Sequence, residues 1–155
     1  GGIDHHTFDP ELFLRVAGAM RDVQFVMVGG SSLPEDWCTL PNVTFLGRKP
    51  YEQVAAYMAA MNALIMPWNR SPWIEACNPI KLKEYLAVGR PVVSTDFPAL
   101  EPYRDLVLTA NAPEAFVAAL RRALSASRSP SVRVTAFVAG AVGALGLSRL
   151  WRGGR

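Results

Sequence analysis

Charged residues gather at the start of a predicted helix in the segment NPIKLKEYLAVGRPVVSTD, residues 78–96. Asn78 and Pro79 have the residue types favoured at a helix N-cap and at the first helical position. The free amides of the first helical turn favour an anion. Lys81 lies in that turn, where its positive charge opposes the helix dipole unless a counter-charge is present. The segment therefore predicts a phosphate-binding site.

Glu84 extends the prediction from a phosphate to a nucleotide. It follows Lys81 by three residues, so the two side chains share one face of the helix. A carboxylate there can accept hydrogen bonds from the vicinal hydroxyls of a ribose, as the acidic residue of dinucleotide-binding folds does. The alternative is that Lys81 and Glu84 form a solvated surface pair and that Asn78-Pro79 only starts a helix. Local chemistry does not exclude this alternative, because capped helix starts are common.

Helical and strand patterns alternate around this segment and must position it. Capped or amphipathic stretches predict helices at residues 10–20, 51–61, 79–88, 98–104 and 113–124. Apolar and β-branched runs predict strands at residues 23–28, 43–46, 63–67, 91–94 and 106–109. This alternation indicates an α/β fold, with a Rossmann-like parallel sheet and helices on both faces. Ligands of such sheets bind beyond the carboxyl ends of the strands, near Gly29-Gly30 and the loop 68–78.

The two ends of the chain depart from this pattern. Residues 1–7, GGIDHHT, resemble the turn after a strand, so the first strand of the fold is expected to be missing. Residues 1–127 are expected to form the single globular domain, with eleven basic and thirteen acidic residues. Residues 128–155 form a Gly/Ala-rich tail with five arginines and no acidic residue. This tail is interpreted as an aberrant, for example frameshifted, terminus, with a marginal surface helix as the alternative.

The composition limits the partners and the location. The tail lacks the dense basic run with interleaved aromatic residues that is typical of nucleic-acid binding, so no nucleic-acid partner is expected. Its basic charge leaves peripheral membrane contact open, but its apolar core is too short to span a bilayer. Cys38 and Cys77 have no spacing that suggests a disulfide framework or a zinc site. We therefore expect a cytoplasmic protein without a metal site.

Three stretches carry a resemblance to a known family. FVMVGG, VTFLGRKPYEQVAAYMAAMNALIMPW and NPIKLKEYLAVGRPVVSTDFPAL resemble, in order and spacing, the nucleotide-sugar-dependent glycosyltransferases of family four, or glycosyl transferases group 1. The last stretch is most similar to a subgroup with Asn-Pro-x-Lys-x-x-Glu-Tyr, many of whose members act in polysaccharide and teichuronic acid synthesis. The resemblance covers about residues 1–125. It implies the C-terminal, donor-binding half of a GT-B fold, in which two Rossmann-like halves face each other across a cleft.

The resemblance also implies roles for individual residues. Glu84 matches the glutamate that binds the donor ribose, and Asn78, Pro79, Ile80 and Lys81 match the segment along the diphosphate and sugar. Gly2 and Gly30 match glycines of strand-end loops that line the cleft, and Arg48 matches a region whose backbone commonly meets the base.

This chain also departs from the family pattern. Many relatives carry a second glutamate at the position of Ala76, whereas Glu75 lies one residue away. The Arg and Lys pair that many relatives place after their first strand is not visible. Trp68 and Trp73, in the loop before the signature, could stack on a base or sugar or could pack the loop. No catalytic residue can be named.

The expected function is that of the donor-binding half of a glycosyltransferase, which moves a sugar from a nucleotide-diphosphate sugar to a hydroxyl acceptor in cell-surface polysaccharide synthesis. The nucleotide sugar would be the substrate, with no separate cofactor, and the acceptor glycan or lipid-linked sugar would bind through an N-terminal half. Whether this chain alone is an enzyme is left open. The alternative is a non-catalytic nucleotide-sugar-binding module or an inactive fragment. A dinucleotide-dependent dehydrogenase is disfavoured because no GxGxxG motif follows a strand.

Overall fold

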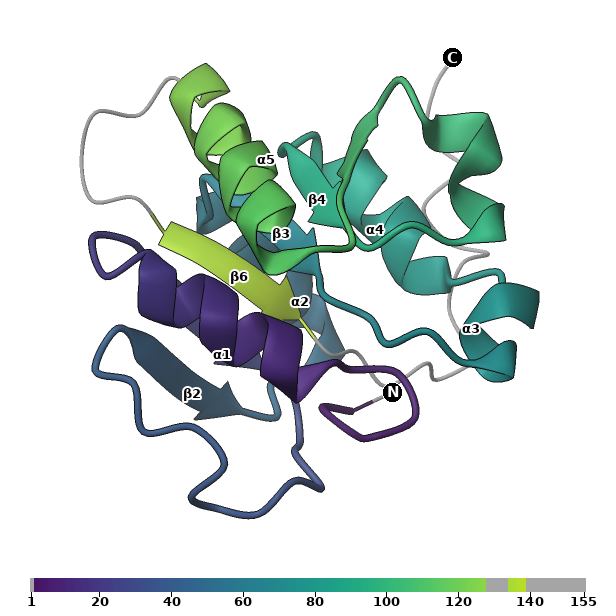
Figure 1. Ribbon diagram of the computed structural model, residues 1–155. Coiled ribbons are helices and arrows are strands. Elements are labelled where there is room, and N and C mark those ends of the chain that lie inside the picture. Colours follow the sequence, from purple (N-terminus) through teal and green to yellow (C-terminus); the bar gives the residue numbers. More distant parts are fainter. Residues whose placement is uncertain (1, 128–133, 139–155) are drawn as a thin grey trace.

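A parallel six-stranded sheet forms the centre of the protein in the computed structural model, which describes residues 2–127 and 134–138 (Figure 1). The strands, in their order across the sheet, are β2 (Val43–Gly47), β1 (Gln24–Val28), β6 (Val134–Val138), β3 (Ala63–Met66), β4 (Val92–Ser94) and β5 (Val107–Thr109). All neighbouring strands are parallel. Their carboxyl ends therefore lie at one edge of the sheet.

Helices cover both faces of this sheet. Helices α1 (Pro10–Ala19) and α5 (Pro113–Ala126) lie together in front of it in Figure 1, and α2 (Tyr51–Ala60) and α4 (Ile80–Val88) lie together behind it. The short helix α3 (Pro72–Ala76) and the 3₁₀ helix η1 (Pro98–Tyr103) lie in connections. The predicted Rossmann-like α/β fold is confirmed. The predicted strands and helices are found with their ends shifted by one or two residues. Among the elements of the described residues, only α3 and β6 were not predicted.

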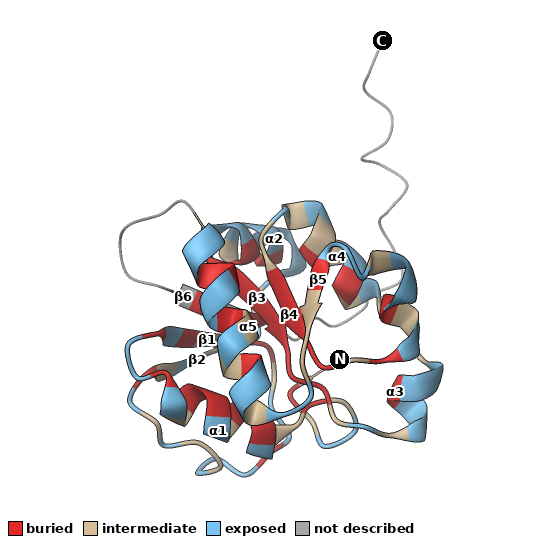
Figure 2. Ribbon diagram, turned by 45° about the horizontal axis from the view of Figure 1, so that its top comes forward, coloured by how far each residue is buried: buried red, intermediate tan, exposed pale blue. Residues whose placement is uncertain are grey.

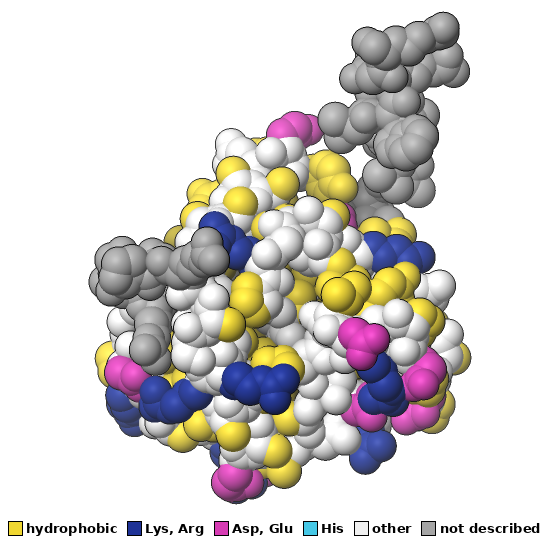
Figure 3. All heavy atoms as spheres, turned by 90° about the horizontal axis from the view of Figure 1, so that it is seen from above, with side chains coloured by type: hydrophobic (Ala, Val, Ile, Leu, Met, Phe, Trp, Pro, Cys, Tyr) yellow, Lys and Arg dark blue, Asp and Glu magenta, His cyan; other side chains and the backbone are white. Residues whose placement is uncertain are grey.

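The middle of the sheet is buried on both sides. Every residue of β3 and β4 is buried, while the outward faces of the helices are exposed (Figure 2). Such strands read as continuous apolar runs in the sequence because helices cover both of their faces. On the face of the molecule seen in Figure 3, basic and acidic side chains are interspersed. No helix in the two described ranges is long and apolar enough to cross a membrane.

The buried side chain of Asn42 joins the end of α1 to the sheet. Its Nδ2 atom donates hydrogen bonds to the carbonyl oxygens of Ala17 (3.0 Å), Met20 (3.1 Å) and Val23 (3.1 Å). Carbonyls at a helix C-terminus have no partner within the helix, so a buried helix end needs such a donor. Asn42 therefore fixes the turn that leads from α1 into β1.

Strand β6 is a correction to the interpretation of the tail. Residues 134–138 form a central strand between β1 and β3, parallel to both, and so are not part of a marginal surface helix. The side chains of Thr135 and Phe137 are buried, and the Phe137 ring lies 5.1 Å from that of Phe8. The Gly/Ala/Arg composition of the whole tail obscured this short β-branched and aromatic run. The remaining tail residues, on which the frameshift hypothesis also depends, lie outside the described residues.

The place of β6 in the sheet is that of a first strand. Counting β6 as strand one, the sheet order becomes 3-2-1-4-5-6, which is the order of dinucleotide-binding folds. Val138 of β6 pairs with Val28 of β1. Ile3 forms a parallel bridge with Ser31, which follows Val28 by three residues. Ile3 thus lies beyond the carboxyl end of β6, where the turn after a first strand belongs. The position in which the sequence lacked a strand is filled by β6.

Candidate functional site

The carboxyl edge of the sheet carries the predicted site residues. Gly30 follows the end of β1, and Arg48 follows the end of β2. Helices α2 and α4 begin at this edge, because each runs from the end of one strand back to the start of the next. Ligands of open α/β sheets bind at such an edge. The residues fall into two groups there.

The first group consists of Gly2, Gly30 and Arg48. The Gly30 carbonyl oxygen accepts a hydrogen bond from the amide of Ile3 (2.8 Å), which holds the N-terminal turn beside the end of β1. A Cβ atom on Gly30 would lie 2.6 Å from Arg48 Nε, and a Cβ atom on Gly2 would lie 3.2 Å from the Gly30 oxygen. These three predicted site residues come from different parts of the sequence and are brought together by the fold. Gly30 leaves the space that the guanidinium occupies.

The second group consists of Lys81 and Glu84 on α4 and Tyr51 at the start of α2. Lys81 Nζ lies 2.6 Å from Glu84 Oε2, and Tyr51 Oη donates a hydrogen bond to Glu84 Oε1 at 3.2 Å. The Lys81 and Glu84 side chains are only 12% and 20% exposed, so they do not form the solvated pair of the alternative interpretation. The charge of Glu84, with the hydrogen bond to it, raises the pKa of Tyr51. Tyr51 therefore stays a protonated donor at neutral pH.

Tyr51 was not predicted as a site residue. The sequence placed Tyr51 at the first position of a predicted helix that follows a strand. Such a helix begins at the carboxyl edge of the sheet, where ligands of this fold bind. The distance in sequence between Tyr51 and Glu84 concealed the contact. The position of a polar aromatic residue at a helix start on this edge was the available signal.

The start of α4 differs from the prediction. The helix begins at Ile80, and Pro79 is its N-cap, with an extended backbone (φ −75°, ψ 123°). Asn78 therefore lies outside the helix and does not cap it, and Pro79 is not its first helical residue. An N-cap proline has no side-chain acceptor, and no capping side chain is found at this helix start among the described residues. The first amides of α4 thus remain available to an anion, which preserves the physical basis of the predicted phosphate site.

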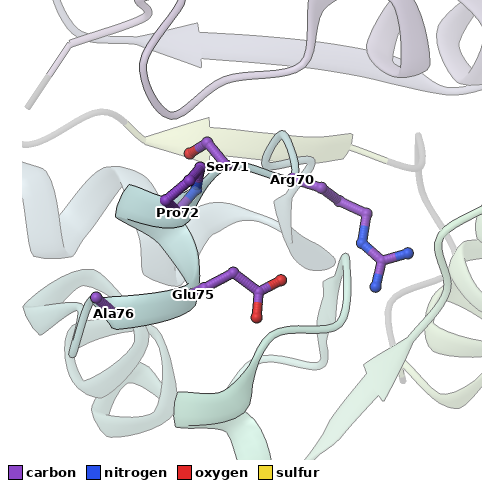
Figure 4. A pocket seen from close by; sticks show the side chains of 5 residues that line it. All are labelled: Arg70, Ser71, Pro72, Glu75 and Ala76. Atoms are coloured by element: carbon purple, nitrogen blue, oxygen red, sulfur yellow. The ribbon is translucent and has the colours of Figure 1, made fainter.

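A surface hollow of about 520 Å³ lies beside α3, in the loop before the signature (Figure 4). It is lined by Arg70, Ser71, Pro72, Glu75 and Ala76. The side chains of Arg70 and Glu75 extend toward the same side of this hollow (Figure 4). Ser71 caps α3 by accepting a hydrogen bond from the amide of Ile74 (3.4 Å), which positions Glu75 in the first turn. Glu75 and Ala76, which are adjacent in the sequence, thus both line this hollow.

The two tryptophans of this loop have different environments. Trp68 is buried and stacks on Phe97, with ring centroids 5.3 Å apart. It packs the loop and is not placed to stack on a base or sugar. Trp73 is 69% exposed on α3. Of the two, only Trp73 presents a free aromatic surface to solvent.

The two residue groups are joined by a short stretch of backbone at the same edge of the sheet. Arg48 and Tyr51 are three residues apart, so their Cα atoms are separated by at most about 11 Å. Arg48 belongs to the first group and Tyr51 to the second, so residues 48–51 connect them. An arginine, a lysine, free helix amides and a hydroxyl-binding carboxylate suit a diphosphate joined to a ribose. Within the described residues, no group of three or more His, Cys, Asp and Glu side chains is placed to hold a metal ion.

The chain is similar to known proteins over most of its length. The family model described as "Glycosyl transferases group 1" matches residues 5–126. A protein of Bacillus subtilis (strain 168) named "Putative teichuronic acid biosynthesis glycosyltransferase TuaH" is 37% identical over 133 residues. The aligned segment covers 80% of this chain and 33% of that relative, so the chain spans about a third of the relative's length. No solved structure shows a significant match.

Proposed function

Because the chain belongs to the glycosyl transferases group 1 family, we propose that it is the C-terminal, donor-binding half of a GT-B glycosyltransferase of the Asn-Pro-x-Lys-x-x-Glu-Tyr subgroup. The complete enzyme would move a sugar from a nucleoside-diphosphate sugar to a hydroxyl acceptor in the synthesis of a cell-surface polysaccharide. The observation that carries the proposal is the largely buried Lys81–Glu84 pair at the ligand-binding edge, next to the uncapped start of α4. The match to a relative named for teichuronic acid biosynthesis supports the class of product.

Glu84 is proposed to bind the ribose of the donor. A carboxylate has about four lone-pair sites, and Lys81 and Tyr51 occupy one on each oxygen. With Lys81 in place, the carboxylate can accept hydrogen bonds from two vicinal hydroxyls that approach from the side of Tyr51. Lys81 fixes the position of the carboxylate, and hydrogen bonds that a carboxylate accepts are charge-assisted.

The diphosphate is proposed to lie at the start of α4, along Asn78, Pro79 and Ile80. The free amides there and the Lys81 ammonium would stabilise the negative charge that develops on the departing diphosphate, and no separate cofactor is invoked. Gly2 and Gly30 would allow close approach to their backbone, and Arg48 would lie toward the base. No residue of the chain is assigned as a catalytic base.

The acceptor is proposed to bind to an N-terminal half that faces this edge. Because the chain spans about a third of its relative's length, the activity of the complete enzyme is proposed to need this second half as well. We propose that residues 1–127, with β6 completing the sheet, are the nucleotide-sugar-binding unit. Cytoplasmic location, with peripheral membrane contact near a lipid-linked acceptor, fits the same function.

Isothermal titration calorimetry with UDP, GDP and NAD tests the proposed donor site. We expect a nucleoside diphosphate to bind with a dissociation constant in the micromolar to millimolar range and to bind Glu84→Gln at least tenfold more weakly. Binding of NAD alone would contradict the proposal. Sugar transfer, assayed with this chain alone and then mixed with an N-terminal half, separates the enzyme from a non-catalytic binding module.

A further inference from the structure

The hydrogen bond between Tyr51 and Glu84 connects the starts of two helices that are far apart in sequence. Tyr51 Oη donates to Glu84 Oε1 across 3.2 Å, while Lys81 holds the other carboxylate oxygen at 2.6 Å. Tyr51 is 61% exposed, whereas the Glu84 side chain is only 20% exposed. The phenol therefore approaches the carboxylate from the solvent side, and the ammonium contacts it along α4.

The Tyr51 hydroxyl has the same chemistry as a sugar hydroxyl. Both are O–H donors, and an ionised carboxylate offers only acceptors. In the free protein, Oε1 of Glu84 is thus already bonded to a hydroxyl. A ligand diol that donates to both oxygens of Glu84 must approach from the same open side, because Lys81 closes the other.

Resting on the proposed function, we infer that Tyr51 is a specificity-determining residue whose hydroxyl occupies the place of one ribose hydroxyl until the donor displaces it. A ligand with two vicinal hydroxyls can replace the lost hydrogen bond and add a second one. A ligand without them gains nothing from Glu84 and leaves the Tyr51 bond in place. The phenol therefore sets how much affinity each ribose hydroxyl contributes.

This role differs from that of a residue that contacts the donor. If Tyr51 only competes with the ribose, removing its hydroxyl frees an acceptor and binding becomes tighter. If Tyr51 instead contacts the bound nucleotide through its hydroxyl, the same change makes binding weaker. The sign of the effect of Tyr51→Phe thus separates the two roles. The substitution keeps the ring, and its exposed position leaves the fold unaffected.

The test compares UDP and GDP with their 2′,3′-dideoxy analogues, by calorimetry, on the wild-type chain, Tyr51→Phe and Glu84→Gln. We expect Tyr51→Phe to bind the better of the two ribonucleotides about three- to tenfold more tightly, in line with the usual strength of a hydrogen bond to a charged group reduced by exposure. The affinity for the matching dideoxy analogue should change by less than twofold. Tyr57→Phe, the same change six residues further along α2, serves as the matched control and should leave both affinities unchanged.

Each result decides a separate point. If the wild type binds a ribonucleotide and Glu84→Gln weakens that binding, while Tyr51→Phe leaves it unchanged or weakens it, the inference fails and the proposed function stands. If the wild type binds neither UDP nor GDP, both fail. An equal gain for the ribonucleotide and its dideoxy analogue would also overturn the inference, because the effect would then not pass through the ribose hydroxyls.

Discussion

The guanidinium of Arg48 lies against the backbone of Gly30, so close that a Cβ atom on Gly30 would stand 2.6 Å from Arg48 Nε. Arg48 comes from the end of β2 and Gly30 from the end of β1. The contact is between a flexible side chain and a backbone without a side chain of its own. Either partner can therefore be changed without disturbing the core.

Gly30→Ala should displace the Arg48 side chain and leave the fold intact. We expect nucleoside-diphosphate affinity to fall about three- to tenfold, which corresponds to roughly 0.7–1.4 kcal/mol, as measured by calorimetry. Gly18→Ala is the matched control: Gly18 has open space around its Cβ position in α1. It should leave binding unchanged and stabilise the protein by about 0.5–1 kcal/mol, because alanine favours a helix. Equal affinity of the wild type and Gly30→Ala would mean that Arg48 does not contribute to nucleotide binding.

Lys81→Ala should weaken nucleoside-diphosphate binding by more than tenfold. The substitution removes a cation from the proposed phosphate site and leaves the largely buried Glu84 carboxylate without its counter-charge. Lys83→Ala is the control, because Lys83 has the same charge on the same helix but is exposed. Calorimetry on the three proteins gives the comparison. A similar loss in both variants would indicate a general electrostatic effect and not a site.

Glu84→Gln should lower the pKa of Tyr51. The charge of Glu84 raises this pKa in the folded protein by disfavouring the phenolate. Neutralising the carboxylate removes that repulsion, so Tyr51 should deprotonate at a lower pH. Ultraviolet titration of the tyrosines, in Glu84→Gln and in Glu84→Gln with Tyr51→Phe, isolates the Tyr51 transition. An unchanged titration curve in Glu84→Gln would mean that the contact does not persist in solution.

Asn42→Ala should destabilise the fold by about 2–4 kcal/mol. It would remove the buried donor that three carbonyl oxygens share, those of Ala17, Met20 and Val23. The first two carbonyls would keep only their backbone donors, the amides of Met20 and Val23. Urea denaturation followed by circular dichroism measures the change. Asn111→Ala is the control: the Asn111 side chain accepts one exposed hydrogen bond from the amide of Asp96, so its loss should cost less than about 1 kcal/mol.

Phe137→Ala tests whether β6 stabilises the sheet. Phe137 is 3% exposed and contacts Phe8, so its truncation should cost about 3–5 kcal/mol of unfolding free energy. Phe45→Ala, on the edge strand β2, is the control because Phe45 is 42% exposed. Denaturation midpoints that coincide for Phe137→Ala and the wild type would refute the central position of β6.

The sequence was sufficient for the fold class because most of its elements carry local signals. The apolar runs of β1 and β3 and the Asp9 cap of α1, whose side chain accepts from the Leu12 amide (2.9 Å), appear as predicted. Helix α3 was missed because five residues give too short a periodic pattern. Strand β6 was missed because its partners lie more than sixty residues away, and no local pattern encodes that pairing.

The candidate site was predicted in part. Spacing on one helix was enough to bring Lys81 and Glu84 together, since residues three apart share a helix face. The Asn78 cap was wrong because Pro79 adopts an extended backbone, which delays the start of α4 by one residue. Tyr51 and the closeness of Arg48 to Gly30 depend on tertiary packing between elements, which a single sequence does not encode locally. The assignment of these residues to a nucleotide sugar stays a prediction.

The position of β6 also governs the order in which the protein can fold during synthesis. Gln24 of β1 pairs with Val134, and Ala63 of β3 pairs with Thr135. The centre of the sheet therefore cannot form until residues 134–138 have been synthesised, after all the other strands. Until then, the pair β1-β2 and the trio β3-β4-β5 expose the unpaired edges that β6 later covers. Contacts over such sequence distances slow folding, and open edges favour aggregation. The nascent chain is therefore expected to depend on chaperones until its central strand is inserted.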